Sequence, residues 1–267
     1  MPTAIRTKGE LLAASGGSPV LRGEVPSATG LPALFLEGEG VWAVAFLRPT
    51  HVHGLNVMLH AGDTGQAMSQ GAVAALDDLV RSAPFASWLA AARQAGATHA
   101  SLPRRSVGTI GDLLADAEHA VGRWEWMWTE AAPPAPPAPV LDLGTGAKTE
   151  IDSLLQADNA RTDGRPFAHP DQRWVGVRDD DGSLVAVGCC EIEQSGTPIL
   201  AGITVAAHAR GRGLGRAVTA ELTRGAVAEH GWCTLGMYSD NPVARGLYLD
   251  LGYQRGAEWT SGAMRPA

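Results

Sequence analysis

Alternating hydrophobic and polar positions predict a meander of strands in the C-terminal half. Apolar runs of strand length occupy residues 139–144, 173–179, 184–194 and 199–205, and polar turns separate the last three. Between the first two runs, residues 148–160 carry apolar side chains at helical spacing. The pattern therefore predicts a strand, a helix and three antiparallel strands in this order.

Beyond the last of these strands, the hydrophobic period changes to that of a helix. Leu214, Val218 and Leu222 recur every four residues, and Gly231 is typical of a helix C-terminus. An apolar run over residues 233–239 then predicts another strand.

A final helix and a final strand complete this half. Asn241 is a preferred N-cap residue, Pro242 suits the first helical position, and Gly252 is expected just past the helix end. Residues 253–261 form the last predicted strand.

The end of the N-terminal half repeats the same order of elements. Residues 90–103 parallel residues 225–238, and residues 111–130 parallel residues 244–261. The first pair predicts a helix followed by a strand, and the second pair predicts a helix followed by a tryptophan-bearing strand. The pattern predicts a degenerate second copy of one fold.

Three tryptophans alternate along the last strand of the first copy. Trp124, Trp126 and Trp128 lie at every second position, so they share one face of that strand. A core or domain-interface role is favoured over a cage for an acceptor.

A proline-rich segment separates the two halves. Residues 130–140, EAAPPAPPAPV, contain five prolines, which disfavour helices and sheet ladders and favour an extended spacer. We expect a first domain at residues 1–130, a linker at residues 131–139 and a second domain at residues 140–267.

Length and charge narrow the class of protein. The 267 residues suffice for two domains, and the formal net charge of -7 argues against a protein that coats nucleic acid. No apolar run approaches the roughly 20 residues that span a bilayer, and the first residues do not resemble a signal peptide. We expect a cytoplasmic protein without a membrane partner.

The cysteines do not predict a metal site. Cys189, Cys190 and Cys233 lack the paired spacing of zinc ligands, and adjacent strand residues face opposite ways. Their odd number fits a reducing compartment.

Residues 210–216, RGRGLGR, follow a predicted strand and open a predicted helix. Unpaired N–H groups at a helix N-terminus attract anions, glycines allow close approach of the backbone, and the arginines add positive charge. The segment thus predicts a pyrophosphate site. It lacks the G-K-[ST] of a P-loop and the position of a dinucleotide fingerprint. A plain helix-entry turn with solvated arginines remains the alternative.

Two motifs together resemble the GNAT family of N-acetyltransferases. Residues 203–218, ITVAAHARGRGLGRAV, are similar to its acetyl-CoA signature, and residues 238–254, YSDNPVARGLYLDLGYQ, are similar to its second signature. The resemblance covers about residues 140–260, and Ala207 stands where the family often has proline. It implies an α/β (α+β) fold of tandem GNAT-like domains, each a mixed, mostly antiparallel twisted sheet flanked by helices.

The resemblance also implies which residues hold acetyl-CoA. It assigns the pantetheine arm to Ile203, Thr204 and Val205, and the pyrophosphate to Arg210, Gly211, Arg212, Gly213, Leu214, Gly215 and Arg216. Asn241 matches a residue that hydrogen-bonds the cofactor, besides its possible role as a helix cap. Tyr248 matches the tyrosine beside the cofactor sulfur, which makes it the candidate acid.

The general base is less well defined. Many family members carry a glutamate on the fourth strand, where this chain has none. Glu191 and Glu193 share one face of the third strand, and Glu191 is our candidate, although a solvated strand carboxylate is the alternative. His169, Asp163 and Asp171 lie in the loop where the family often binds acceptors. Loop polar residues are usually solvated.

The N-terminal copy lacks the arginines of the cradle. Its strand at residues 55–62 leads into residues 63–71, DTGQAMSQG, which carry Asp63 and no arginine, so we expect no cofactor there.

Two functional hypotheses follow. The leading one is an acetyl-CoA-dependent N-acetyltransferase that acts on a primary amine of a small molecule or peptide by direct attack in a ternary complex. The alternative is an acyl-CoA-binding sensor or interaction module with little turnover. The role of Tyr248 favours the enzyme, because a sensor needs no proton donor.

Overall fold

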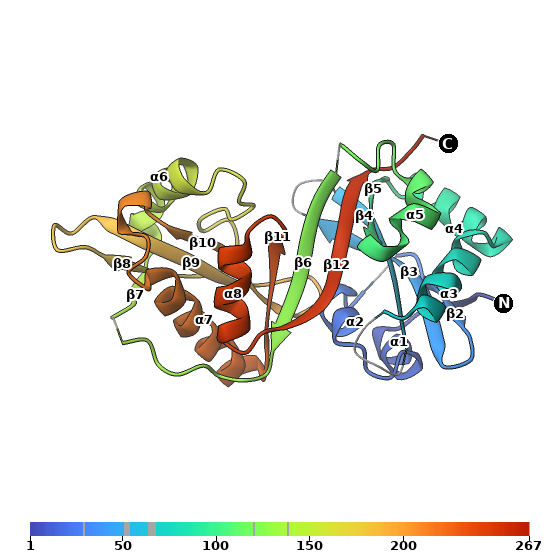
Figure 1. The fold of residues 1–267 in the computed structure, drawn as a ribbon, viewed down its shortest axis with the longest axis horizontal. Helices are drawn as coiled ribbons and strands as arrows, with labels where there is room; N and C mark the ends of the chain where they lie inside the picture. Colours follow the sequence, from blue (N-terminus) through green and yellow to red (C-terminus); the bar gives the residue numbers. More distant parts are fainter. Residues whose placement is uncertain (29, 51–53, 64–67, 120, 138, 267) are drawn as a thin grey trace.

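The protein is seen here in a computed structural model that shows one continuous sheet covered by helices (Figure 1). The structure describes residues 1–28, 30–50, 54–63, 68–119, 121–137 and 139–266. Among them, no helix combines the length and apolar character needed to cross a membrane.

The N-terminal half contains six strands and five α-helices within the described residues. They are β1 (Thr3–Ile5), α1 (Lys8–Ala14), α2 (Pro19–Glu24), β2 (Ala33–Glu37), β3 (Val41–Thr50), β4 (Gly54–Asp63), α3 (Gln70–Val80), α4 (Ala83–Gln94), β5 (Ala97–Pro103), α5 (Val107–Ile110) and β6 (Val121–Thr129).

The C-terminal half contains six strands and three α-helices within the part of the chain that the structure describes. They are β7 (Leu141–Leu143), α6 (Lys148–Asp158), β8 (Arg173–Arg178), β9 (Leu184–Ile192), β10 (Pro198–Val205), α7 (Leu214–His230), β11 (Cys233–Tyr238), α8 (Pro242–Asp250) and β12 (Gln254–Ala263).

The two halves of the sheet have the same strand order. From one edge the strands are β1 to β5 followed by β12, and from the other edge they are β7 to β11 followed by β6, so each strand of the first half corresponds to the strand six numbers higher. The order is β1-β2-β3-β4-β5-β12-β6-β11-β10-β9-β8-β7. Among the described residues, the parallel pairs are β4 with β5 and β10 with β11. The predicted fold class, a mixed and mostly antiparallel sheet flanked by helices, is confirmed, and the repeated topology supports a duplicated unit.

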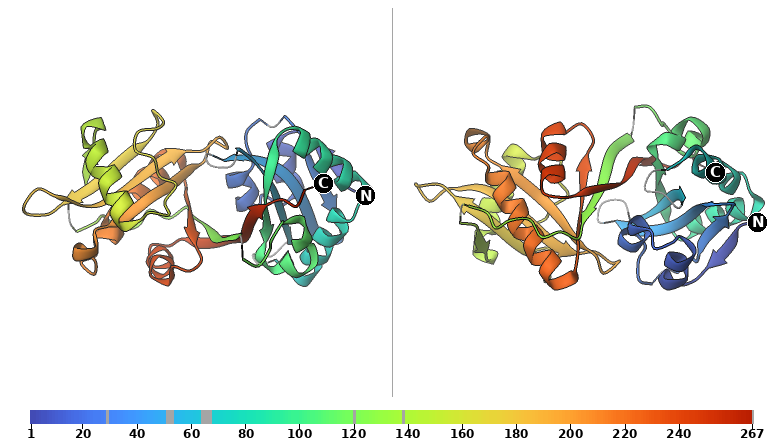
Figure 2. Two further views of the ribbon diagram at one scale, coloured as in Figure 1. Left: turned by 90° about the horizontal axis from the view of Figure 1, so that it is seen from above. Right: turned by 60° about the horizontal axis from the view of Figure 1, so that its bottom comes forward.

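The last strand of each half lies in the sheet of the other half. β6 pairs with β11 from Cys233↔Thr129 to Tyr238↔Trp124, and β12 pairs with β5 as well as with β6. Figure 2 shows two helix-covered lobes joined through these two central strands. Backbone hydrogen bonds of the sheet therefore cross the domain boundary that the sequence led us to expect.

A hydrophobic cluster between the halves, which includes Trp126, Trp232 and Trp259, explains the alternating tryptophans. Trp126 is buried beside Trp232, with ring centroids 6.4 Å apart. A Cβ atom added at Gly23 of α2 or at Gly256 of β12 would lie 2.4 Å from the Trp126 ring, so glycine is required at both positions. The expected core and interface role is confirmed for Trp126.

Helix ends follow the sequence in the C-terminal half and differ in one place in the N-terminal half. Gly231 (φ 79°) ends α7, and the side chain of Asn241 caps α8. The helix expected from residue 111 onwards is reduced to a single 3₁₀ turn at Gly111–Leu113, which follows α5. Asp116 Oδ1 instead accepts two backbone N–H groups in a turn, a competition typical of aspartate.

Candidate active site

The parallel strands β10 and β11 separate after two residue pairs. Ile199 pairs with Thr234 and Leu200 with Leu235, and no further pair joins the two strands among the described residues. β10 bends at Gly202 (φ 65°), where its register with β9 also shifts. The edge of β10 at residues 203–205 thus has no neighbouring strand on the β11 side, and an extended ligand could pair with it.

The turn after β10 presents the N-terminus of α7 to open space. Gly211 (φ 79°) and Gly213 (φ 78°) adopt the left-handed conformation, and a Cβ atom added at either would meet nothing within 4 Å. Gly213 is the N-cap of α7, and no side chain caps this end. The first N–H groups of a 17-residue helix are therefore available to an anion, so this cradle fits a pyrophosphate.

The three arginines of the cradle each have an acidic partner. The ion pairs are Arg210 with Asp158 (3.0 Å), Arg212 with Asp179 (2.9 Å) and Arg216 with Asp250 (3.8 Å). All three arginines are about half exposed, where such pairs contribute little and can exchange for a ligand phosphate. The backbone N–H groups are thus the best-defined hydrogen-bond donors that the site offers to an anion.

Arg210 also has a structural contact that the sequence did not reveal. Its Nε donates to the carbonyl of Val205 (3.2 Å), while its Nη2 reaches Asp158 at the end of α6. This guanidinium ties the end of β10 to the turn that follows it.

Tyr248 is buried on α8. It is 7% exposed, and its ring packs against Tyr253 with centroids 5.9 Å apart. Burial raises the pKa of Tyr248 to about 12, so the phenol is protonated at neutral pH. Asn241, the N-cap residue of α8, uses Oδ1 to accept the N–H of Ala244 (3.0 Å).

The loop between α6 and β8 is fastened across the open end of β10 and β11. Asn159 Nδ2 donates to Thr204 Oγ1 (3.0 Å), and Arg161 forms two hydrogen bonds of 2.9 Å with Asp240. The Arg161 guanidinium also stacks on Tyr238, 4.4 Å from the ring centre. This loop therefore borders the opening where β10 and β11 separate.

The candidate base is tied to this loop. Glu191 Oε2 accepts a hydrogen bond of 2.6 Å from Gln172 Nε2, and Gln172 Oε1 in turn accepts from Ala168 and Trp174. Glu191 lies opposite Ile199, before the point where β10 bends. The structure shows no contact between Glu191 and Tyr248 among the described residues.

Glu193, one residue beyond the end of β9, forms an ion pair with the N-terminal half. Its carboxylate pairs with Arg48 of β3 (3.0 Å), which also lies 3.2 Å from the buried carboxylate of Glu24. Burial raises the pKa of Glu24 to about 7. Of the loop residues, Asp171 accepts the N–H of Ile192 (3.0 Å), and Asp163 helps to raise the pKa of Tyr238, after the larger effect of burial.

No group of metal-ligating side chains occurs in the described part of the chain. Burial raises the pKa of Cys233 to about 12 and of Cys189 and Cys190 above their ordinary value, so these thiols are not ionised at neutral pH.

A cleft of about 970 Å³ opens in the N-terminal half. It lies where β4 and β5 separate beyond Met58↔Ser101, and the first residues of β12 contribute to its wall. The glycine-containing segment expected after β4 falls partly on residues 64–67, which lie outside the described residues. The cleft does not include the arginine-glycine segment of the C-terminal half.

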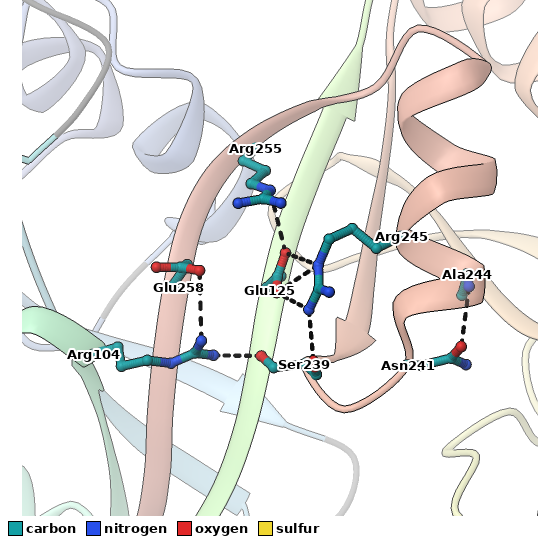
Figure 3. A network of polar contacts seen from close by, with 8 residues as sticks. All are labelled: Arg104, Glu125, Ser239, Asn241, Ala244, Arg245, Arg255 and Glu258. Atoms are coloured by element: carbon teal, nitrogen blue, oxygen red, sulfur yellow. Dashed lines mark hydrogen bonds and ion pairs between the residues drawn. The ribbon is translucent and has the colours of Figure 1, made fainter.

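A polar network that the sequence analysis missed surrounds the start of α8 (Figure 3). Glu125 of β6 is 1% exposed, and both of its oxygens accept from Arg245 Nε at 3.0 and 3.1 Å. Arg104 donates to the Ser239 hydroxyl and lies 3.5 Å from Glu258. An acidic residue between alternating tryptophans was the available signal, because it must face away from them.

Comparison with known proteins agrees with this geometry. Residues 128–253 match the model of the acetyltransferase (GNAT) family. The fold is similar to a GCN5-related N-acetyltransferase from Sphaerobacter thermophilus (TM-score 0.55, 16% identity, 100% of this chain and 96% of that one). It is also similar to a GNAT-family protein from Novosphingobium aromaticivorans (TM-score 0.51, 18% identity, 96% of both chains). No curated protein sequence matches the chain.

The fold and the site thus define an acetyltransferase-type domain. The family model matches residues 128–253, the region that contains both sequence motifs. The matched segment begins within β6, the strand that the N-terminal half contributes to the C-terminal sheet.

Proposed function

We propose that the C-terminal half transfers an acetyl group from acetyl-CoA to a primary amine of a small molecule or peptide, by direct attack in a ternary complex. The observation that carries this proposal is the continuity between the uncapped N-terminus of α7 and the edge of β10 at residues 203–205. Among the described residues this edge has no neighbouring strand, and its Ile203 and Val205 carbonyls accept only from the side chains of Asn159 and Arg210. Residues 203–205 would pair with the pantetheine arm, and residues 210–216 would hold the pyrophosphate. Asn241 would add a hydrogen bond through its amide.

Two tasks then fall to side chains of this chain: one accepts the proton of the attacking amine, and the other stabilises the leaving thiolate. A lysine-like amine costs on the order of 4 kcal/mol to present neutral at pH 7.4, whereas an α-amine costs under about 1 kcal/mol. We propose that Glu191 accepts this proton through water, held in place by Gln172. Tyr248 would donate a hydrogen bond to the leaving thiolate.

The division of labour between the halves is part of the proposal. Residues 1–130 would bind no acetyl-CoA, residues 131–139 would serve as linker, and residues 140–267 would carry the reaction. Titration calorimetry with acetyl-CoA should then give one site per chain. Two sites would contradict the proposed role of the first half.

A screen of amines and peptides with acetyl-CoA tests the activity. We expect thiol release that depends on the acceptor, with the acetylated amine detected by mass spectrometry. Tight binding of acetyl-CoA without release, across lysine-like and α-amine acceptors, would instead favour an acyl-CoA sensor.

A further inference from the structure

We infer that Glu125, a residue of the N-terminal half, positions the start of α8 for the reaction of the C-terminal half. This inference rests on the proposed function. It gives the exchanged strand β6 a role in the site beyond completing the sheet.

Each backbone and side-chain polar group of Ser239 forms a hydrogen bond, either with a residue of the N-terminal half or with Arg245, which the N-terminal half holds in place. Its N–H donates to the carbonyl of Arg123 (2.9 Å), and its hydroxyl accepts from Arg104. Its carbonyl accepts from Arg245 Nη2 (2.6 Å), and the same guanidinium is fixed by Glu125. Figure 3 shows the contacts from Arg104 and Arg245 that meet at Ser239, in the turn between β11 and α8.

This turn sets the place of both candidate site residues on α8. Ser239 lies two residues before the cap Asn241, and Arg245 lies three residues before Tyr248, about one helical turn. The Glu125 carboxylate is buried and receives Arg245 through both oxygens, a geometry that fixes direction as well as distance. Loss of this pair would let the first turn of α8 shift, and misplacement of about 1 Å can slow catalysis severely.

Glu125→Gln is the test variant, and Arg255→Gln is its matched control. Arg255 approaches the same carboxylate from β12 at 3.6 Å, but among the described residues it forms no hydrogen bond or ion pair with Ser239 or α8. We expect Glu125→Gln to lower kcat at least 10-fold, with KM for acetyl-CoA rising only a few-fold, and Arg255→Gln to change both less than 3-fold.

The double variant Glu125→Gln/Arg245→Gln separates positioning from stability. Removing both partners leaves no unpaired buried charge, so its melting temperature should recover relative to the less stable single variant. If Glu125 positions α8, kcat of the double variant stays at least 10-fold low. Recovery of kcat together with stability would overturn the inference. If Glu125→Gln fails to fold, Arg245→Lys, which cannot bridge both partners, takes its place.

Amide hydrogen exchange gives a readout that does not require turnover. In Glu125→Gln, the backbone amides between residues 239 and 245, Pro242 excepted, should exchange at least 10-fold faster, while those in the middle of α7 stay unchanged. Unchanged exchange at residues 239–245 would overturn the inference even if the wild-type protein is active. Absence of turnover in the wild type, with faster exchange in the variant, would instead count against the proposed function alone.

Discussion

Replacing Tyr248 by phenylalanine should abolish most of the activity without destabilising the protein. The hydroxyl of Tyr248 has no hydrogen-bond partner among the described residues, so its removal breaks no contact there. We expect the free energy of unfolding to change by less than about 0.5 kcal/mol. The ring keeps its packing against Tyr253.

The expected loss of rate follows from the pKa of the phenol. With the pKa of Tyr248 at about 12 and that of a thiol near 8.5, complete proton transfer would be uphill by roughly 5 kcal/mol. The hydroxyl would therefore act as a hydrogen-bond donor to the leaving sulfur. Losing it should lower kcat about 10²-fold, or about 2.7 kcal/mol, and change acetyl-CoA affinity by only a few-fold.

Tyr253→Phe provides the control with the opposite outcome. The Tyr253 hydroxyl lies 2.8 Å from Thr223 Oγ1 and 3.2 Å from Cys233 Sγ, so its loss should cost about 1 kcal/mol of stability and leave kcat within a few-fold. Both variants are compared by steady-state kinetics on the identified acceptor and by denaturant unfolding. Near-wild-type kcat in Tyr248→Phe would refute the assignment of Tyr248 as the acid.

Four further predictions concern other parts of the molecule. Gly213→Asp should weaken acetyl-CoA binding at least 10-fold more than Gly213→Asn in calorimetry, because only aspartate places a negative charge at the anion site; equal affinities would count against a pyrophosphate there. The raised pKa of Glu24 means that its contribution to stability is present below pH 4.5 and is lost as the pH rises through 7; relative to Glu24→Gln, the wild-type free energy of unfolding should fall by about 3 kcal/mol over this range, and a constant difference would contradict the burial argument. Gly256→Ala should destabilise the protein by about 1–3 kcal/mol in denaturant unfolding, since its methyl group would overlap Trp126, and a neutral effect would show that the ring can move. Glu191→Gln should lower kcat/KM more for a lysine-like amine than for an α-amine, and equal losses would remove Glu191 as the base.

The local elements of the C-terminal half could be predicted because their signals are local. Gly231 and Asn241 mark helix ends through their own backbone or side-chain preferences, and both lie where the sequence placed them. Gly211 and Gly213 likewise indicate a turn with left-handed backbone conformations, and both residues have positive φ in the structure.

The strand exchange and the polar network could not be predicted in this way. Glu125 and Arg245 are 120 positions apart, and Arg210 and Asp158 are 52 apart, so neither pairing leaves a local pattern. The hydrophobic alternation of β6 is satisfied equally well beside any strand that offers a matching face. Which half receives β6 is decided by tertiary packing around Trp126.

Acetyl-CoA labelled in its acetyl group tests the central claim most directly. The account predicts that the label moves to the acceptor amine at the rate of thiol release, that none accumulates on the protein, and that Gly213→Asp abolishes both processes. Label that stays on the coenzyme across the full amine panel, or transfer by Gly213→Asp at the wild-type rate, would contradict acetyl transfer at the N-terminus of α7.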